Sequence, residues 1–214
     1  MSIYISSVSV PFREGEDAAI AQALRRIRLS PGKARAYIVK SSVDARRRSD
    51  IRLVYTVGVD CDGEEAIVRR AGDPSVRLHR PQQPSFVPGT APLAARPVVV
   101  GFGPAGMFAA LTLARLGYRP LVLERGADVD RRVAAVERFW RTGSFDPVSN
   151  VQFGEGGAGT FSDGKLTTRI NDPLCEEVLR VFAGHGADPS ILKKAKPHIG
   201  TDYLRRVVKS IREE

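Results

Sequence analysis

Residues 97–125 read PVVVGFGPAGMFAALTLARLGYRPLVLER and decide the fold class of the second half of the chain. A short apolar strand leads into Gly101, Gly103 and Gly106, which have GxGxxG spacing and stand at the opening of a helical pattern. In such a turn the first glycine allows a sharp bend, the second lets the backbone approach a diphosphate, and the third lets the helix pack closely on the strand. The stretch therefore predicts a β-α-β unit with an anion-binding turn.

The helix after the turn is expected to run from Pro104 to Leu116. Pro104 and Ala105 would then lie at its N-terminus, where free N–H groups and the positive end of the helix dipole favour a phosphate. Glu124 ends the next apolar strand about 20 residues further on, where an acid binds the ribose hydroxyls of adenosine and repels a 2′-phosphate. Arg125 could reach the same nucleotide, or lie in a solvated turn. An α/β unit that binds no ligand is the alternative.

The same pattern indicates how helix and strand pack. Ala110, Ala114 and Gly117 have the spacing of small residues on the helix face that lies against a sheet, and Leu121 to Glu124 is expected to be a buried parallel strand.

The first part of the chain has a different pattern. Strands are expected over residues 3–10, 36–40 and 51–59, and a helix over residues 16–27. This β-α-β-β order predicts a small α+β domain, for which a ferredoxin-like fold is one candidate. Residues 80–96 are rich in proline and lack a hydrophobic period, so we expect an accessory domain at 1–79, a linker at 80–96 and a nucleotide-binding domain at 97–214.

Composition restricts the partners. A net charge of +9 raises the possibility of a nucleic acid or another polyanion. The charge is spread over both halves, and no helix-turn-helix, zinc finger or aromatic RNP pattern accompanies it, which argues against nucleic acid. Arg46, Arg47 and Arg48 could contact phosphates, but adjacent acids favour a solvated connection instead.

Location and metal binding follow from other signals. No apolar run is long enough to cross a membrane, and the N-terminus lacks the features of a secretory signal, so we expect a cytoplasmic protein without a membrane partner. Cys61 and Cys175 lie far apart and are expected to be free thiols, and no cysteine-histidine cluster suggests a metal site.

A second glycine-rich segment lies at residues 154–159 and reads GEGGAG. It is not expected to be a second dinucleotide turn, because no buried strand precedes it and residues 160–163 do not have a helical pattern. It is not a phosphate-binding P-loop either, because Leu166 stands where that motif needs a hydroxyl for magnesium. A loop with so many positions lacking a Cβ could lie against a large planar group, or be a flexible surface loop.

Two stretches resemble a known family. The stretch from Val98 to Gly126 resembles the N-terminal FAD fingerprint of the glutathione-reductase-like flavoprotein superfamily. Residues 150–169, NVQFGEGGAGTFSDGKLTTR, resemble the second glycine-rich segment of the bacterial FAD-dependent dehydrogenases, a resemblance that extends to residues 44–57 and to the C-terminus. It implies a Rossmann-like FAD-binding module and a flavin that lies against Gly156, Gly157, Ala158, Gly159, Ser162 and Lys165.

The resemblance also implies a class of reaction. Related disulfide reductases carry a redox-active cysteine pair in this segment, and residues 150–169 contain no cysteine. Hydride or electron transfer through a non-covalently bound FAD, with NAD(P)H as a possible co-substrate, is therefore expected. Lys165 could stabilise negative charge on a reduced flavin, or be a solvated side chain. The substrate, the electron acceptor and the catalytic residues are not identifiable.

Flavoproteins of this superfamily complete the FAD site with a later Gly-Asp segment, and none follows residue 170. The chain is therefore expected to be the N-terminal, ADP-binding part of a longer enzyme that ends in an amphipathic helix from Tyr203, with Thr201 and Asp202 as capping residues. His198 precedes that helix and has no assigned role. An NAD-binding Rossmann enzyme, or an RNA- or polyanion-binding module at residues 1–79, is the alternative.

Overall fold

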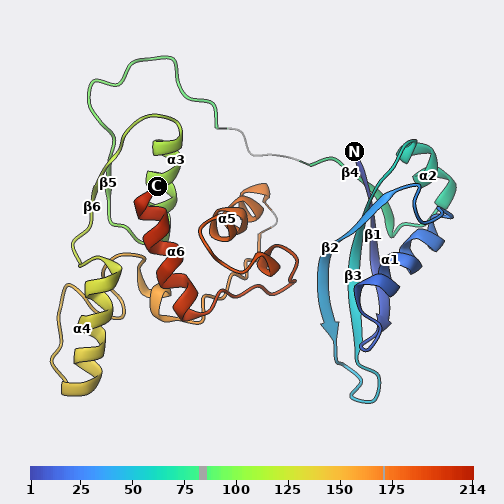
Figure 1. Cartoon of the computed structure of the whole chain (residues 1–214). Helices are drawn as coiled ribbons and strands as arrows, with labels where there is room; N and C mark the ends of the chain where they lie inside the picture. The colour runs from blue at the N-terminus through green and yellow to red at the C-terminus, as the bar shows by residue number, and fades with distance from the viewer. Residues whose placement is uncertain (82–85, 171) are drawn as a thin grey trace. The chain divides into compact units, whose positions relative to one another are not determined.

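The computed structural model describes residues 1–81, 86–170 and 172–214 (Figure 1). The chain forms two compact units. Unit 1 comprises Met1–Gln83 and Pro189–Pro197, and unit 2 comprises Pro84–Asp188 and His198–Glu214. Residues 82–85 of the expected linker lie outside the described residues, and residues 86–97 contain no helix or strand.

The N-terminal segment of unit 1 has its helices and strands in the order β-α-β-β-α-β. They are β1 (Ser2–Pro11), α1 (Gly15–Arg26), β2 (Arg35–Asp44), β3 (Arg52–Asp60), α2 (Glu64–Ala71) and β4 (Val76–His79). The four strands form an antiparallel sheet in the order β2-β3-β1-β4. Acidic residues begin and arginines end both helices, as the helix dipole favours.

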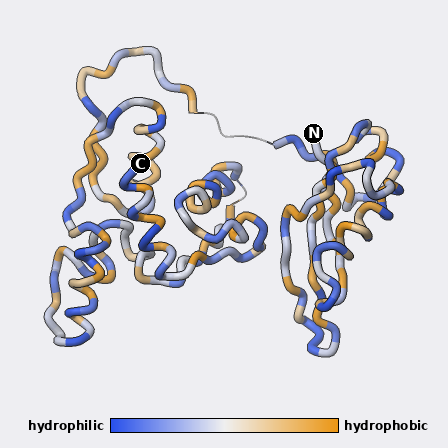
Figure 2. Tube along the Cα trace, in the orientation of Figure 1, coloured by the Kyte–Doolittle hydropathy of each residue, from blue (hydrophilic) through white to orange (hydrophobic). Residues whose placement is uncertain are grey.

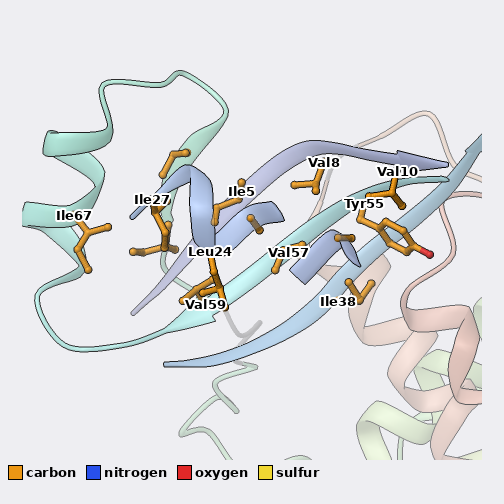
Figure 3. Close-up of a cluster of buried hydrophobic side chains, with 14 residues drawn as sticks. Ile5, Val8, Val10, Leu24, Ile27, Ile38, Tyr55, Val57, Val59 and Ile67 are labelled. Atoms are coloured by element: carbon orange, nitrogen blue, oxygen red, sulfur yellow. The ribbon is translucent and has the colours of Figure 1, made fainter. Parts of the chain in front are cut away.

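The core of unit 1 lies between the sheet and the two helices (Figure 3). Ile3, Ile5, Val8 and Val10 of β1 all point into it. They can do so because a bulge with Ser7 at φ 55° shifts the register between Ile5 and Val8. Along β2, residues 193–195 add backbone hydrogen bonds, since the Ser41 N–H donates to the Lys193 carbonyl at 2.7 Å.

Some expectations for this unit were incomplete. The strand predicted at residues 36–40 is the longer β2, and the sequence pattern missed α2 and β4 altogether. The helix α2 has only eight residues and a single buried side chain, Ile67, so its hydrophobic period is too short to stand out.

Unit 2 begins with the expected β-α-β unit. It consists of β5 (Val98–Val100), α3 (Pro104–Arg115) and β6 (Leu121–Leu123), and the two strands pair in parallel. The remaining elements are α4 (Val129–Thr142), the 3₁₀ turn η1 (Ala158–Phe161), α5 (Pro173–Gly184) and α6 (Thr201–Glu213), while the 3₁₀ turn η2 (Pro189–Leu192) belongs to unit 1. The structure is thus mixed α/β, with one antiparallel sheet and one small parallel sheet.

The expectation that the strand from Leu121 is buried was wrong. Val98 and Val100 of β5 are 55% and 82% exposed, and Leu121 and Leu123 of β6 are 44% and 51% exposed. Figure 2 shows the hydrophobic colour along this strand pair. The alternate residues Val99 and Val122 are half-buried, so this small sheet is covered on one face only. On α3, Ala110 is buried as expected, whereas Ala114 is exposed, as is Gly117 beyond the end of the helix.

Candidate functional site

The turn after β5 has the geometry that its glycines predict. Gly101 adopts φ +90°, which only glycine adopts readily, and its N–H donates to the Leu123 carbonyl at 2.7 Å. A Cβ at Gly106 would overlap the Gly101 carbonyl oxygen, so the helix approaches the turn as closely as the third glycine of the motif allows. These two glycines are needed by the turn itself.

Gly103 differs from its two neighbours in the motif. Its φ of −73° and ψ of −177° suit any residue, and a Cβ built there meets no atom within 4 Å. Gly103 is the N-cap of α3, followed by Pro104 and Ala105, both exposed in the first turn. The fold therefore does not require glycine at 103, and the space in front of the helix N-terminus is open to a ligand.

Glu124 is held against this turn. One carboxylate oxygen accepts the Phe102 N–H at 2.6 Å, and the other accepts the Gly126 N–H at 2.8 Å. The sequence pattern predicted an acid at the end of this strand but not the two hydrogen bonds. A carboxylate offers about four acceptor directions, so Glu124 keeps capacity for two hydroxyl donors.

The second glycine-rich segment packs directly on the first. The Gly156 N–H donates to the Phe102 carbonyl at 2.8 Å, and a Cβ at Gly157 would lie 3.1 Å from Pro104 Cδ. The structure thus brings together two segments that are some fifty residues apart in the sequence. A Cβ at Gly156 would overlap Thr160 Oγ1, so internal packing accounts for that glycine, while Ala158 and Gly159 remain accessible.

The other expected residues lie around this junction, where Ser162 and Lys165 contact their own segment and Arg125 contacts the second glycine-rich segment. Ser162 Oγ donates to the Gly159 carbonyl at 2.8 Å, Lys165 is exposed and pairs with Asp163 at 3.4 Å, and Arg125 lies over the Phe153 ring at 5.1 Å. The prediction that residues 160–163 are not helical was wrong in part, because η1 includes Thr160 and Phe161.

The capping prediction for α6 was also wrong. The N-cap of α6 is Gly200, and no side chain caps the helix. The Thr201 hydroxyl instead donates to the Ser162 carbonyl at 2.9 Å, so it ties α6 to the second glycine-rich segment.

Arg132 is the functional residue that sequence reasoning missed. Its side chain is fully buried on α4 and donates to the carbonyls of residues 150, 151, 154, 155 and 157 at 2.6–3.3 Å. Burial lowers the pKa of Arg132 to about 10, although the nearby Glu124 and Glu155 act in the opposite direction. This one guanidinium fixes the path of the second glycine-rich segment. The available signal was its position three residues after Val129 and four before Val136, on the buried face of the helix.

Glu155 is the second buried charge of this junction. It accepts the Val129 N–H at the start of α4 at 2.5 Å, and Arg212 of α6 lies 3.3 Å away. Burial is the largest influence and raises the pKa of Glu155 above its usual value, although the Val129 N–H and Arg212 lower it.

The raised pKa gives a pH-dependent contribution to stability. Because folded Glu155 holds its proton to higher pH than the unfolded chain does, its contribution to stability should fall as the pH rises from about 4.5. Glu155→Gln should remove this contribution while it keeps an acceptor for the Val129 N–H. Urea unfolding from pH 4.5 to 7 measures the free energy of unfolding of both proteins. The value for the variant minus that for the wild type should increase with pH. A constant difference would contradict the assignment, and Glu137→Gln, at an exposed position of α4, is the control.

A cavity of about 530 Å³ lies beside Glu124 within unit 2. Met107, Ala110 and Leu111 of α3, Val122 of β6 and Ile211 of α6 supply its apolar wall. Arg119, Asp128, Glu155, Arg212 and Glu214 add charged groups. The site therefore joins a glycine turn at a helix N-terminus, an acid with two backbone donors and a mostly apolar recess.

Three further findings concern metal ions, membrane spans and cysteines. The described residues contain no cluster of three histidine, cysteine or acidic side chains that could hold a metal ion. In the same part of the chain, no helix combines the length and the hydropathy of a membrane span. Cys61 and Cys175 are free, as the sequence predicted.

Comparison with known proteins adds two findings. Residues 2–60 match the model of a family described as a domain of unknown function, DUF8436. The whole chain is 46% identical, over 216 aligned residues, to an uncharacterized protein of Clostridium beijerinckii. The chain spans 40% of the length of that relative.

Proposed function

We propose that the chain carries the ADP-binding half of an FAD-dependent oxidoreductase. The observation that carries the proposal is the open space at Gly103, in front of the N-terminus of α3 and next to the fixed carboxylate of Glu124. Neither the backbone angles nor the packing at Gly103 demand glycine, and a residue without a side chain allows a ligand to approach the backbone closely. The parallel pair β5–β6 joined through α3 supports a Rossmann-like β-α-β module.

The residues present fit a dinucleotide. The first N–H groups of α3, at Gly103 and Ala105, would bind the diphosphate, and Glu124 would accept the two adenosine ribose hydroxyls. Gly157, Ala158 and Gly159, with Ser162, Lys165 and Arg125 around them, would border the flavin side. A bound flavin supplies hydride or electron transfer, with NAD(P)H as the proposed co-substrate, while the residues of this chain bind and orient it.

The other parts of the chain have supporting roles in this proposal. The order β-α-β-β-α-β and the sheet order of unit 1 support a ferredoxin-like accessory domain. The matched relative is much longer than this chain, which supports a substrate side formed by polypeptide outside residues 1–214.

Glu124→Gln tests the adenosine end of the site. The amide retains one acceptor oxygen, so one of the two N–H groups at Phe102 and Gly126 should lose its partner, at a cost of about 1–3 kcal/mol in unfolding free energy. We expect roughly tenfold weaker binding of ADP by isothermal titration calorimetry, since a hydrogen bond to a charged group contributes about 1.5–3 kcal/mol. The control is Glu137→Gln. ADP affinity equal to that of the wild type would remove Glu124 from the site, and tighter binding of NAD than of FAD would favour a nicotinamide enzyme.

A further inference from the structure

The sheet of unit 1 has a second face, directed away from its core. The buried side chains of the strands, of α1 and of α2 form one cluster (Figure 3). The alternate residues point the other way, and we call the surface that they form the open face. Its members include Ser2, Tyr4, Arg35, Tyr37, Gly58, Asp60, Arg77 and His79.

Aromatic side chains line up across this face. Tyr4 of β1 is paired with Arg77 of β4 on one side and with Gly58 of β3 on the other, and Gly58 is paired with Tyr37 of β2. Arg77, Tyr4, Gly58 and Tyr37 therefore form one row across all four strands. Both tyrosines are half-buried, so part of each side chain remains accessible.

Gly58 explains how the ring of Tyr37 lies. A Cβ at Gly58 would be 2.6 Å from the Tyr37 ring and 2.9 Å from Val39 Cγ2, so the ring occupies the space above this glycine. The Tyr37 hydroxyl is 3.3 Å from both Ser2 Oγ and the Asp60 carboxylate. Glycine in a central strand costs stability, and here it allows an aromatic ring to lie over the backbone.

Beside the row, two aromatic rings of this face stack on each other. The rings of Tyr4 and His79 are 4.0 Å apart, with an angle of 12° between their planes. His79 is half-buried at the end of β4 and extends the aromatic surface beyond Tyr4. Planar rings arranged in this way offer stacking surface to nucleobases.

Charge and polarity indicate the kind of partner. Arg35 lies over the Tyr37 ring at 5.9 Å, and both Arg35 and Arg77 are exposed. Ser2 and Asp60 contribute polar groups beside the Tyr37 hydroxyl, and Val39 adds an aliphatic side chain next to Gly58 on the same face. Aromatic rings flanked by arginines are complementary to bases joined by phosphates.

We infer that the open face of unit 1 binds single-stranded nucleic acid, with bases stacked on Tyr4, Tyr37 and His79 and phosphates near Arg35 and Arg77. This function is separate from the proposed flavin site. It also uses other residues than the arginine run at 46–48, in which Arg46 is held by Asp44 at the β2–β3 connection. The spread of charge and the lack of nucleic-acid-binding motifs argued against this partner in the sequence. Composition does not show which side chains share a sheet face, so the open face could not be recognised from it.

The test uses the 214-residue protein and a fluorescein-labelled single-stranded RNA of about 10 nucleotides, a length within the range of known single-strand sites. Fluorescence anisotropy should show saturable binding that weakens with salt. Tyr37→Leu keeps an apolar cover over Gly58 but removes the ring, and it should weaken binding roughly tenfold. Tyr37→Phe keeps the ring and should bind like the wild type.

Two controls make the result specific. Tyr203→Leu removes an exposed tyrosine of α6 that also has an arginine over its ring, Arg206, and it should have no effect. Gly103→Val should bind RNA normally, which separates this site from the dinucleotide site. Equal binding of single-stranded and duplex RNA, unchanged in Tyr37→Leu, would overturn the inference, as would the absence of saturable binding. AMP that displaced the labelled oligonucleotide at a comparable concentration would identify a free nucleotide as the ligand of this face instead.

Discussion

Arg132→Met is expected to release the second glycine-rich segment and to destabilise unit 2 by about 3–5 kcal/mol, the range for removing one partner from a buried charged network. Methionine fills part of the volume but donates no hydrogen bond, so the carbonyls of Asn150, Val151 and Glu155 would lose a charged donor. Buried carbonyls without a donor are costly, so a large stability effect is expected from this one side chain.

Hydrogen exchange and urea unfolding measure this effect. In Arg132→Met, amides of residues 150–161 should exchange faster, and the unfolding midpoint of unit 2 should fall, while peptides from β1 and β3 keep their protection. The matched control is Arg131→Met, because Arg131 is exposed and its ion pair with Asp128 lies on the surface. If the two variants behaved alike, Arg132 would not be the residue that fixes this segment.

Gly103→Val is expected to abolish dinucleotide binding at a loss of only about 1 kcal/mol in stability, the usual cost of an apolar residue at a helix N-cap. Valine suits the extended backbone at this position, and its Cβ meets no atom within 4 Å in the free protein. The same side chain would fill the space where a diphosphate meets the N-terminus of α3, so affinity for ADP should fall by more than about 100-fold, a loss of roughly 3 kcal/mol.

Two other glycines make this result interpretable. Gly106→Ala should damage the turn itself, because its Cβ would overlap the Gly101 carbonyl oxygen. Gly184→Ala, near the end of α5 with nothing close to its Cβ, should change neither stability nor binding. Loss of binding together with unfolding in Gly103→Val would mean that the glycine serves the fold.

The sequence predicted the β-α-β unit and its glycine turn well because their requirements are local. The apolar strand, the spacing of Gly101, Gly103 and Gly106, and the acid at 124 all lie within one β-α-β unit. The bulge in β1 was not predicted, although the spacing of Ile3 and Ile5 relative to Val8 and Val10 carries its signal. A change of phase within an alternating strand indicates an extra residue.

The remaining features depend on contacts between distant segments. A buried arginine such as Arg132 is rare, and the carbonyls that it binds lie about twenty residues away in an irregular segment. The exposure of Val98 and Val100 depends on what covers the sheet rather than on the strand itself. The aromatic row of unit 1 depends on the register between β1, β2 and β3, which the sequence does not specify. Its Arg77 end lies on β4, the strand that the sequence pattern missed.

The central claim is that the turn at Gly103 binds the ADP part of FAD. Its most direct test is calorimetric titration of the 214-residue protein with ADP and with FAD, beside the Gly103→Val variant. The account predicts saturable binding of both ligands to the wild type, with mutual competition, and none to the stably folded variant. Two results would contradict it. One is a folded wild-type protein that binds neither ligand, and the other is a Gly103→Val variant that binds both ligands as tightly as the wild type does.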